Sequence, residues 1–476
     1  MLEAVWIGFA FSLGLVVRAV GLPPLVGYLL AGFVISATAS DLNLPPEGPS
    51  IIHHVAHLGV LLLLFTVGLK LNVRSLGKPE VLGGSTLHFV LSIVLTLPAV
   101  LFIFDVSWYQ ALMLAVALAF SSTVLAAKVL EGKREIRAFH GRVAIGILIM
   151  QDLLALLVMS LANGTTPSPW ALLVFALPLL RPLLYKLLDA SGHEDLLILF
   201  GLMLALVIGG QGFELVGLSS ELGALVFGAM LAKHQRAGEL SKSLWSIKEF
   251  FLVGFFLQIG ISGLPGPDAL AFAVVMALLL PLKGLLFFVL FVMFRLRARS
   301  AFLGSVSLTN YSEFGLIVAS VVLPQWLIPL AITVALSFVI SAPLTRLAHP
   351  LYERLARWLI PLERDTEHPD EQPLSLGNAQ IVIMGMGRTG RAAFDYLRAK
   401  GFEVVGLDSD PVVIETCAKA GRRALFADGE DQMLWQRLQM PRVEAVILAL
   451  NDAETKIISI GQLRERGFSG RSLGRR

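Results

Sequence analysis

The sequence contains little cysteine and little charge. Cys417 is the only cysteine among 476 residues, which excludes a disulfide framework, a cysteine-rich zinc site and an iron–sulfur cluster. Only 15% of the residues are charged and 56% are hydrophobic, whereas roughly a quarter are charged in ordinary soluble proteins. The first ten residues lack a basic segment, so we interpret them as the start of a membrane span and not as a cleaved signal. These shortages exclude a disordered chain and a simple soluble enzyme.

Long apolar segments fill the chain up to about residue 342. Each is about 16 to 26 residues long, enough to cross roughly 30 Å of hydrocarbon as a helix. We count thirteen such segments, several of them interrupted by Gly or Pro, which membrane helices tolerate when neighbouring helices satisfy the freed backbone groups. Their centres are Phe11, Leu30, Leu62, Val94, Leu118, Asp152, Val174, Met203, Phe227, Phe255, Leu280, Tyr311 and Ala335.

Basic residues follow an alternating pattern between these segments. Of the nineteen Lys and Arg residues before residue 343, eighteen fall in connections that follow odd-numbered segments, among them Lys242 and Lys248 after the ninth. The positive-inside rule then predicts that the N-terminus lies outside and the C-terminus lies in the cytoplasm. The small positive net charge of +3 is thereby explained without nucleic-acid binding.

The composition changes after the last apolar segment. We predict a membrane domain over residues 1–358, a charged, proline-containing linker over 359–379, and a cytoplasmic domain over 380–476. In the last region, QIVIMGMG is a buried strand that enters a glycine turn, RTGRAAFDYLRAKG an amphipathic helix, and EVVGLDSD a second strand. This succession predicts a Rossmann-like α/β domain.

Polar residues interrupt the apolar pattern near the centres of four segments. Gln151 and Asp152 lie in the sixth segment and Lys283 lies in the eleventh. Ionisable groups are costly in a bilayer and usually mark ion paths. A midplane carboxylate such as Asp152 holds either a proton or a cation, and this competition combined with alternating exposure is sufficient for antiport. We expect Lys283 to neutralise Asp152 when no cation is bound.

Two further polar clusters predict broken helices. The fifth segment contains Ser121, Ser122 and Thr123, and the twelfth contains the run from Thr309 to Glu313, which includes Ser312. Broken helices expose carbonyls and half-helix ends that can face an ion. The fifth and twelfth segments differ by seven in order, which is the arrangement of inverted repeats. For Glu313 we weigh a structural or proton-path role against direct ligation.

The α/β region contains a nucleotide-binding pattern. A GxGxxG motif follows the first strand and opens a helix, and Asp408 ends the next strand. In this context the glycines allow a pyrophosphate to approach the helix N-terminus, and the aspartate binds ribose hydroxyls, which favours NAD(H) or AMP over NADP. The candidate residues are Gly385, Gly387, Arg388, Thr389, Gly390 and Asp408, with Asp410 and Asp428 as weaker candidates. A dehydrogenase is the alternative, but no substrate domain remains for it, so we expect a sensor.

Seven segments together carry a family likeness. In order they read GLPPLVGYLLAGFVI, HLGVLLLLFTVGLKL, AFSSTVLAAKVLE, GILIMQDLLAL, GALVFGAMLA, FFLQIGISG and YSEFGLIVAS. They resemble the Kef-type monovalent cation (potassium)/proton antiporters, which carry a C-terminal nucleotide-binding domain of the TrkA-N type. The resemblance implies a homodimer in the bacterial inner membrane, an elevator-like motion, and potassium efflux coupled to proton entry.

The same resemblance assigns roles to residues. It implies that Gln151 and Asp152 bind the ion, that the Ser121–Thr123 and Ser312–Phe314 runs are the helix breaks, and that Lys283 is the midmembrane lysine. Two features depart from the family. The stretch GELSKSLWSIKEF has Lys242 where glutathione-responsive members are acidic, and the chain ends soon after the fourth predicted strand, so we expect the nucleotide domain to be incomplete.

We therefore predict a secondary antiporter and not an enzyme. We expect it to exchange K⁺ for H⁺ across the inner membrane under the control of a bound nucleotide. Whether an ancillary regulatory protein takes part is left open. A sodium/proton antiporter of the same fold is the close alternative. A nucleotide-gated cation channel is the alternative of another class.

Overall fold

A computed structural model describes most of the chain. The described residues are 2–38, 48–70, 76–133, 135, 138–162, 176–364, 368, 375–409, 411–427, 438, 440, 442–450, 453–465, 468 and 471–474. The chain divides into two compact units. One consists of Met1–Ala126, Val143–Phe294 and Ala301–Arg357, and the other of Ala127–Arg142, Arg295–Ser300 and Trp358–Arg476. The predicted domain boundaries at 358 and 379 stay predictions.

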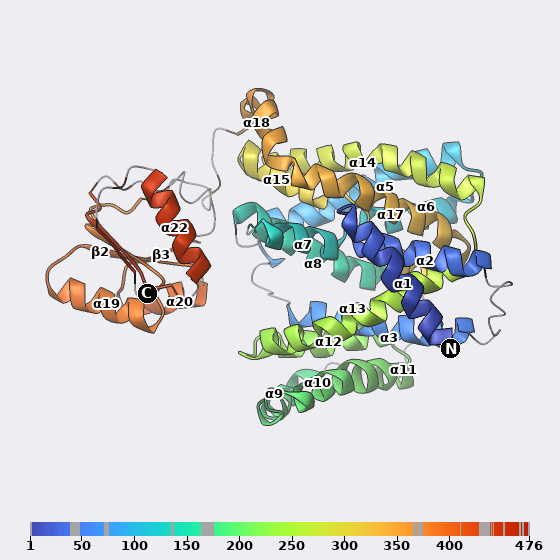
Figure 1. Cartoon of the computed structure of the whole chain (residues 1–476), viewed down its shortest axis with the longest axis horizontal. Coiled ribbons are helices and arrows are strands. Elements are labelled where there is room, and N and C mark those ends of the chain that lie inside the picture. The colour runs from blue at the N-terminus through green and yellow to red at the C-terminus, as the bar shows by residue number, and fades with distance from the viewer. Residues whose placement is uncertain are drawn as a thin grey trace. The chain divides into compact units, whose positions relative to one another are not determined.

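The regular elements among the described residues up to 362 are helices (Figure 1). The first group is α1 (Leu2–Ala19), α2 (Pro24–Thr38), α3 (Gly48–Leu69), α5 (Pro79–Ile103), α6 (Trp108–Ala119), α7 (Thr123–Gly132), α8 (Phe139–Ala162), α9 (Arg181–Ala190) and α10 (Asp195–Leu202). The second is η2 (Met203–Gln211), α11 (Gly212–Leu215), α12 (Ser220–Leu231), α13 (Ala237–Ile261), α14 (Pro267–Met293), α15 (Ala298–Leu308), α16 (Glu313–Val322), η3 (Pro324–Trp326), α17 (Leu327–Arg346), α18 (Ala348–Leu359) and η4 (Ile360–Leu362).

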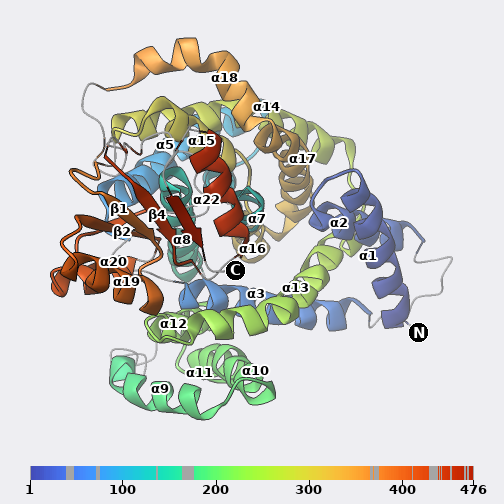
Figure 2. The same ribbon diagram turned by 60° about the vertical axis from the view of Figure 1, so that its left-hand side comes forward.

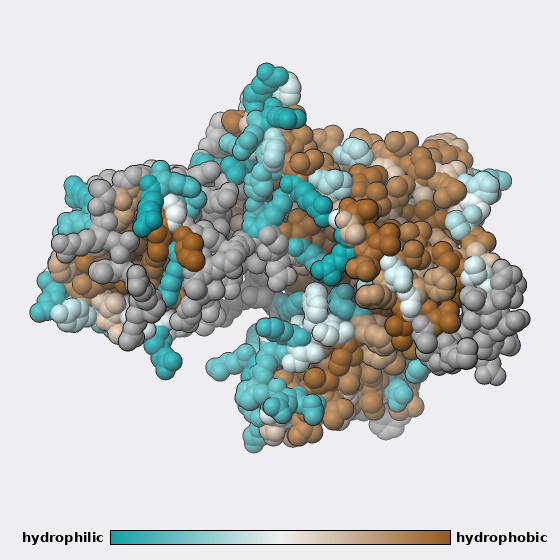
Figure 3. All heavy atoms as spheres, viewed as in Figure 1, coloured by the Kyte–Doolittle hydropathy of each residue, from teal (hydrophilic) through white to brown (hydrophobic). Residues whose placement is uncertain are grey.

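Seven of the described helical stretches are long and apolar enough to cross a membrane. They are Pro79–Ile103, Trp108–Leu130, Phe139–Met159, Asp195–Leu215, Ala237–Ile261, Pro267–Met293 and Pro324–Arg346. Shorter apolar helices cover Val5–Ala19, Pro24–Thr38, His54–Leu69, Ser220–Leu231 and Glu313–Val322. The helical membrane-type region is thus confirmed, but the count of thirteen is not, and the predicted centre at Val174 lies outside the described residues. Hydrophobic side chains cover much of the visible surface of this region (Figure 3). Phe102 and Leu278 are among the exposed hydrophobic residues.

The helices pack as two bundles within the first unit (Figure 2). We call one the α3–α13 bundle; it contains α1, α2, α3, η2, α12 and α13. The other, the α6–α16 bundle, contains α5, α6, α14, α16 and α17, and α8 joins it because Val81 of α5 packs against Ile149 of α8. The predicted connection residues Lys242 and Lys248 lie instead on α13, because this helix already begins at Ala237.

Glycines set the helix spacing in the α3–α13 bundle. A Cβ atom at Gly32 of α2 would lie 2.5 Å from the carbonyl oxygen of Leu257 on α13, and one at Gly228 of α12 would collide with the carbonyl oxygen of Phe65 on α3. These helices therefore touch backbone to backbone, as small residues allow in membrane helix packing. No larger side chain fits at either crossing without moving a helix.

The C-terminal region is a five-stranded parallel sheet of order β3-β2-β1-β4-β5. The strands are β1 (Ile381–Met384), β2 (Val404–Asp408), β3 (Ala424–Phe426), β4 (Ala445–Leu448) and β5 (Arg471–Gly474), and the helices are α19 (Arg388–Ala399), α20 (Pro411–Lys419) and α22 (Ala453–Glu465). Helices α19 and α20 lie on one face and α22 on the other (Figures 1 and 2). The predicted α/β domain is confirmed, and the short fifth strand was not predicted. Strand β1 pairs with both β2 and β4, so the order reverses there, which is where open parallel sheets bind ligands.

Cys417 lies in the core of this domain. Its side chain is 0% exposed and packs with Ile383 and Phe394 beneath the sheet. Burial raises the pKa of the Cys417 thiol, because the thiolate loses its hydration.

We expect native Cys417 to react with a maleimide at least about 100-fold more slowly than in the denatured chain, since reaction requires opening of the domain. Mass spectrometry of the intact protein follows the labelling without interference, because no second cysteine exists. Labelling of the native protein at the rate of the denatured control would contradict this packing.

Candidate functional site

Two broken helices cross inside the α6–α16 bundle. Residues 120–122 separate α6 from α7, and residues 309–312 separate α15 from α16. Both interruptions fall at the polar clusters that predict them. The two broken segments touch closely, since a Cβ atom at Gly315 of α16 would collide with the carbonyl oxygen of Ala117 on α6. Only glycine permits this approach.

Each break is held by polar groups of the other. Ser121 Oγ donates to the carbonyl of Leu308 at 2.9 Å, and the N–H of Ser122 donates to Asn310 Oδ1 at 2.6 Å. Asn310 Nδ2 in turn donates to the carbonyl of Ser307 at 3.0 Å. Buried backbone groups must be paired in a membrane interior, so the two breaks satisfy one another.

Lys283 on α14 forms hydrogen bonds to backbone carbonyls at the two helix breaks. Its Nζ atom donates to the carbonyl oxygens of Leu118 at 3.1 Å, Phe120 at 2.6 Å and Asn310 at 2.9 Å. The side chain is buried, and its Nζ lies 4.8 Å from the centre of the Tyr311 ring. The ammonium thus sits where α6 and α15 end, and the C-terminal ends of helices attract positive charge.

The expected neutralisation of Asp152 by Lys283 is not seen. Both residues are described, and no ion pair joins them in this part of the chain. An ammonium has three donor hydrogens, and the three carbonyls take all of them. Lys283 therefore secures the breaks in this conformation and leaves Asp152 to other partners.

Asp152 and Gln151 lie side by side on α8, each almost fully buried. The hydroxyl of Thr123, the first residue of α7, lies 3.2 and 3.3 Å from the two carboxylate oxygens of Asp152 and donates to them. Gln151 Oε1 accepts the N–H of Ser121 at 2.9 Å, and Gln151 Nε2 has no hydrogen-bond partner among the described residues. The carboxylate therefore lies at the N-terminal end of a half-helix, which favours negative charge.

Glu313 begins the other half-helix, α16. Its side chain is 0% exposed, and neither carboxylate oxygen has a hydrogen bond of normal geometry within the described part of the chain, although Ser122 is an electrostatic neighbour. Ser312 caps the helix by accepting the N–H of Phe314 at 3.1 Å. Glu313 interacts electrostatically with Asp152. The structure thus places two buried acidic groups within electrostatic range of one another, and among the described residues the two Glu313 oxygens lack a hydrogen-bond partner.

Two residues add to the predicted set. Asn310 bridges the breaks, and its only sequence signal is an amide in the middle of an apolar segment. His88 of α5 stacks on Phe287 with ring centres 3.4 Å apart and lies within electrostatic range of Lys283. Its nearest hydrogen-bond partner is the hydroxyl of Ser92.

The glycine loop of the α/β domain has the geometry of a phosphate cradle. Gly385 has φ +93°, and a Cβ atom at Gly390 would collide with the carbonyl oxygen of Gly385. Gly387 has no atom within 4 Å of a Cβ position, so open space lies before the first helical residues, Arg388 and Thr389. This combination of tight turn, open approach and close helix packing is what a pyrophosphate requires.

Asp408 ends β2 beside this loop. Its Oδ2 atom accepts the N–H of Met386 at 2.6 Å, so the predicted ribose-binding carboxylate fixes the loop in this structure. The weaker candidates Asp410 and Asp428 lie outside the described residues.

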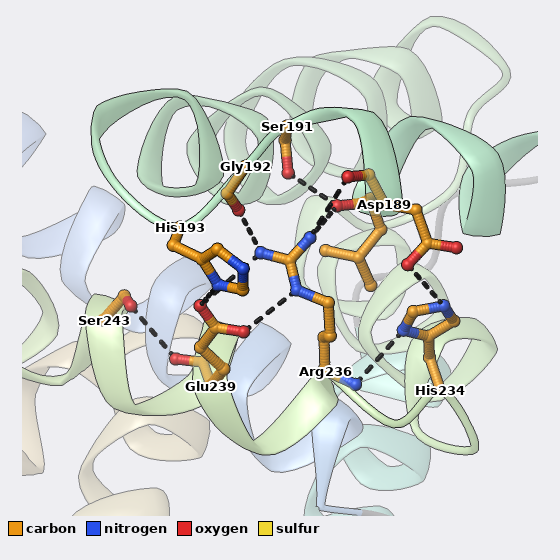
Figure 4. A network of polar contacts seen from close by, with 9 residues as sticks. Asp189, Ser191, Gly192, His193, His234, Arg236, Glu239 and Ser243 are labelled. Atoms are coloured by element: carbon orange, nitrogen blue, oxygen red, sulfur yellow. Dashed lines mark hydrogen bonds and ion pairs between the residues drawn. The ribbon is translucent and has the colours of Figure 1, made fainter.

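A separate polar network joins the α9–α10 connection to the start of α13 (Figure 4). Arg236 donates to the carbonyls of Leu188 at 2.6 Å and Gly192, and to Glu239 Oε2 at 2.9 Å. Glu239 also contacts His193 Nδ1 at 2.6 Å. Glu239 belongs to the GELSKSLWSIKEF stretch, so this network gives that stretch a structural role.

Two protein-family models match this chain. The family model for the sodium/hydrogen exchanger transmembrane domain matches residues 7–347, and the TrkA-N domain model matches residues 381–468. The chain belongs to the sodium/hydrogen exchanger family, whose members are transporters and not enzymes.

Among individual proteins, the chain is similar to the glutathione-regulated potassium-efflux system protein KefC of Salmonella arizonae. The two are 27% identical over 488 residues, which cover 96% of this chain and 76% of that protein. KefC of Salmonella typhi is 27% identical over 484 residues, with 95% and 76% covered. The Kef-type resemblance is thereby confirmed.

A solved structure shares the fold. The sodium proton antiporter MjNhaP1 of Methanocaldococcus jannaschii matches with a TM-score of 0.55 and 14% sequence identity, over 74% of this chain and 97% of that one.

The bridging role of Asn310 is testable by stability. Asn310→Ala leaves the buried N–H of Ser122 without an acceptor, so we expect a loss of about 1–3 kcal/mol, measured as a lower unfolding temperature in detergent. Ser320→Ala on α16 is the control, because that hydroxyl bonds only within its own helix. Equal effects of the two substitutions would show that the bridge contributes nothing.

Proposed function

We propose that the protein exchanges K⁺ for H⁺ across the membrane by competition at Asp152. The observation that carries this proposal is a buried carboxylate at the crossing of two broken helices, held by the hydroxyl of Thr123 and not by the Lys283 ammonium. Protonation neutralises Asp152 and removes its attraction for a cation, whereas ionisation restores it. The same group therefore binds either ion but not both with full affinity.

The surrounding residues serve this exchange. We propose that Asp152 is the carrier carboxylate, that Gln151 and Thr123 supply further oxygens, and that Ser121 and Ser122 shape the break. Glu313, with Ser312 as its helix cap, adds a second acidic oxygen pair or a proton path. Lys283 keeps the half-helix ends in place, so that the electrostatic field at Asp152 is fixed before the ion arrives.

The choice of K⁺ rests on similarity. Relatives that align with nearly the whole chain are named as potassium-efflux proteins, and the alignment covers 95–96% of this chain. Sodium is the alternative transported ion, because the family model and MjNhaP1 are named for sodium. Paired K⁺ and Na⁺ titrations of proton release distinguish the two.

The membrane arrangement belongs to the same proposal. We propose thirteen spans in inverted repeats, an outer N-terminus, a cytoplasmic C-terminal domain, a homodimer, and residence in the bacterial inner membrane. The alternating basic residues support the orientation, and the shorter apolar helices in the described part of the chain support a larger count than the seven long stretches alone.

The C-terminal domain is proposed to bind NAD(H) or AMP as a regulator. Gly385, Gly387 and Gly390 would receive the pyrophosphate at the start of α19, and Asp408 would exchange its bond to the Met386 N–H for ribose hydroxyls. Arg388 and Thr389 lie on the first turn, where phosphate oxygens would be bound. The weaker candidates Asp410 and Asp428 follow the second and third strands.

Transport by an Asp152→Asn variant tests the central assignment. We expect cation-driven proton movement in proteoliposomes to fall at least about 100-fold, because an amide can neither release a proton nor attract a cation. Asp268→Asn, which neutralises an exposed carboxylate on α14, is the control and keeps the flux. Full flux in Asp152→Asn would refute the assignment, and flux insensitive to the proton gradient would favour a channel.

A Gly387→Ala variant tests the nucleotide site. The methyl group meets no atom within 4 Å, so the fold stays intact, but it fills the path of the pyrophosphate. We expect NADH and AMP to bind at least about tenfold more weakly by isothermal titration calorimetry, a loss of roughly 1.4 kcal/mol. Gly461→Ala on α22, also in open space, is the matched control. Unchanged affinity in Gly387→Ala would place the nucleotide elsewhere.

A further inference from the structure

A short amphipathic helix beside the last membrane-type helix has no role in the exchange described so far. Helix α18 follows directly after α17, whose candidate span ends at Arg346. In Figure 1, α18 crosses the direction of α14, another candidate span, and in Figures 1 and 2 it lies at the outer edge of the helical region. A helix that leaves the end of a span in this way is placed to lie along the membrane surface.

One face of α18 is occupied by protein. Ala348 packs with Leu303 of α15, and the Tyr352 ring lies 5.9 Å from the ring of Phe302 on the same helix. Ala348 and Tyr352 are four residues apart, so they lie on one face of α18. A lipid can therefore meet only the remaining surface of the helix.

One edge beside this face combines aromatic and basic side chains. At 3.6 residues per turn, Arg354 lies one turn before Trp358, whereas Glu353 lies about 140° away from Trp358 on the other edge. Trp358 is 57% exposed, and Ile360 and Leu362, which follow the helix, are 51% and 55% exposed. Arg354 is exposed and has no ion pair within the described part of the chain.

The chemistry of this edge fits a membrane interface. Large apolar side chains that gather on an exposed surface mark a contact with a membrane or a partner. Tryptophan sits at the level of the lipid headgroups, and arginine binds phosphate oxygens while its apolar stem covers hydrocarbon. The position directly beyond a span and the positive charge of Arg354 together favour an anionic phospholipid as the partner.

We propose that α18 is an interfacial helix whose Trp358 edge enters the headgroup region, where Arg354 binds the phosphate of an anionic phospholipid. The inference depends on the membrane location of the chain and not on the proposed K⁺/H⁺ exchange. Helix α18 then anchors to the bilayer the segment that connects α17 with the α/β domain.

Quenching of a fluorophore by lipids tests the placement of α18. A bimane is attached to the full chain in a Cys417→Ala background, at Trp358→Cys or at the control Glu353→Cys on the other edge. Both native side chains are exposed, so these substitutions leave the packing intact. In vesicles, we expect a spin-labelled phospholipid to quench the bimane at position 358 at least about threefold more strongly than at position 353. Equal quenching at the two positions would overturn the interfacial placement.

The same reporter at position 358 tests the headgroup. We expect spin-labelled phosphatidylglycerol to quench at least about twofold more strongly than spin-labelled phosphatidylcholine, because a basic residue near the surface attracts anionic headgroups. Arg354→Gln removes this preference, whereas Lys419→Gln, which removes an exposed charge from α20, keeps it. A preference that survives Arg354→Gln, or none before that substitution, would refute the headgroup assignment.

A second measurement decides if Trp358→Cys does not fold. Added phosphatidylglycerol is expected to raise the unfolding temperature of the wild-type chain in detergent by about 2 °C more than phosphatidylcholine does, since a lipid that binds the folded chain stabilises it. Arg354→Gln abolishes this difference. Equal unfolding temperatures of the wild-type chain in the two lipids would overturn the proposal.

Discussion

The bonds between the Lys283 ammonium and three carbonyl oxygens hold the centre of the membrane domain together. A helix interrupted inside an apolar bundle leaves backbone groups unpaired, and each unpaired group costs several kcal/mol away from water. A buried ammonium is equally unfavourable alone. Here one satisfies the other, since Lys283 bonds the carbonyls of Leu118, Phe120 and Asn310. Without Lys283 these three carbonyls would be left unpaired, and the positions of Asp152 and Glu313 depend on the breaks.

This arrangement also separates the charges. Helices α6 and α15 direct their C-terminal ends at Lys283, whereas α7 and α16 begin at Thr123 and Glu313. Positive charge is consequently retained at the carbonyl ends, and acidic groups gather at the amide ends. Because its hydrogens are committed to carbonyls, Lys283 forms no ion pair with Asp152 in this conformation. In the proposed exchange, Lys283 would therefore not compete with a cation for the carboxylate of Asp152.

Much of this site was predictable, because polar residues in apolar segments are conspicuous. Gln151, Asp152 and the two break clusters lie where polar residues interrupt an apolar segment. In the α/β domain, the apolar runs of β1 and β2 predict buried strands, the first followed by a glycine loop and the second ending at an aspartate. The partners of Lys283 were not predictable, since a backbone carbonyl has no sequence signature. Lys248 was misplaced because the charged start of α13 resembles a connection, and β5 was missed because RSLG lacks an apolar strand pattern.

The helices within each of the two bundles are held together by different interactions. In the α3–α13 bundle, glycines such as Gly32 and Gly228 bring backbones into contact and fix the spacing. In the α6–α16 bundle, the bonds of Ser121, Asn310 and Lys283 join only helices of that bundle. A displacement of one bundle against the other therefore leaves the bonds around the breaks intact.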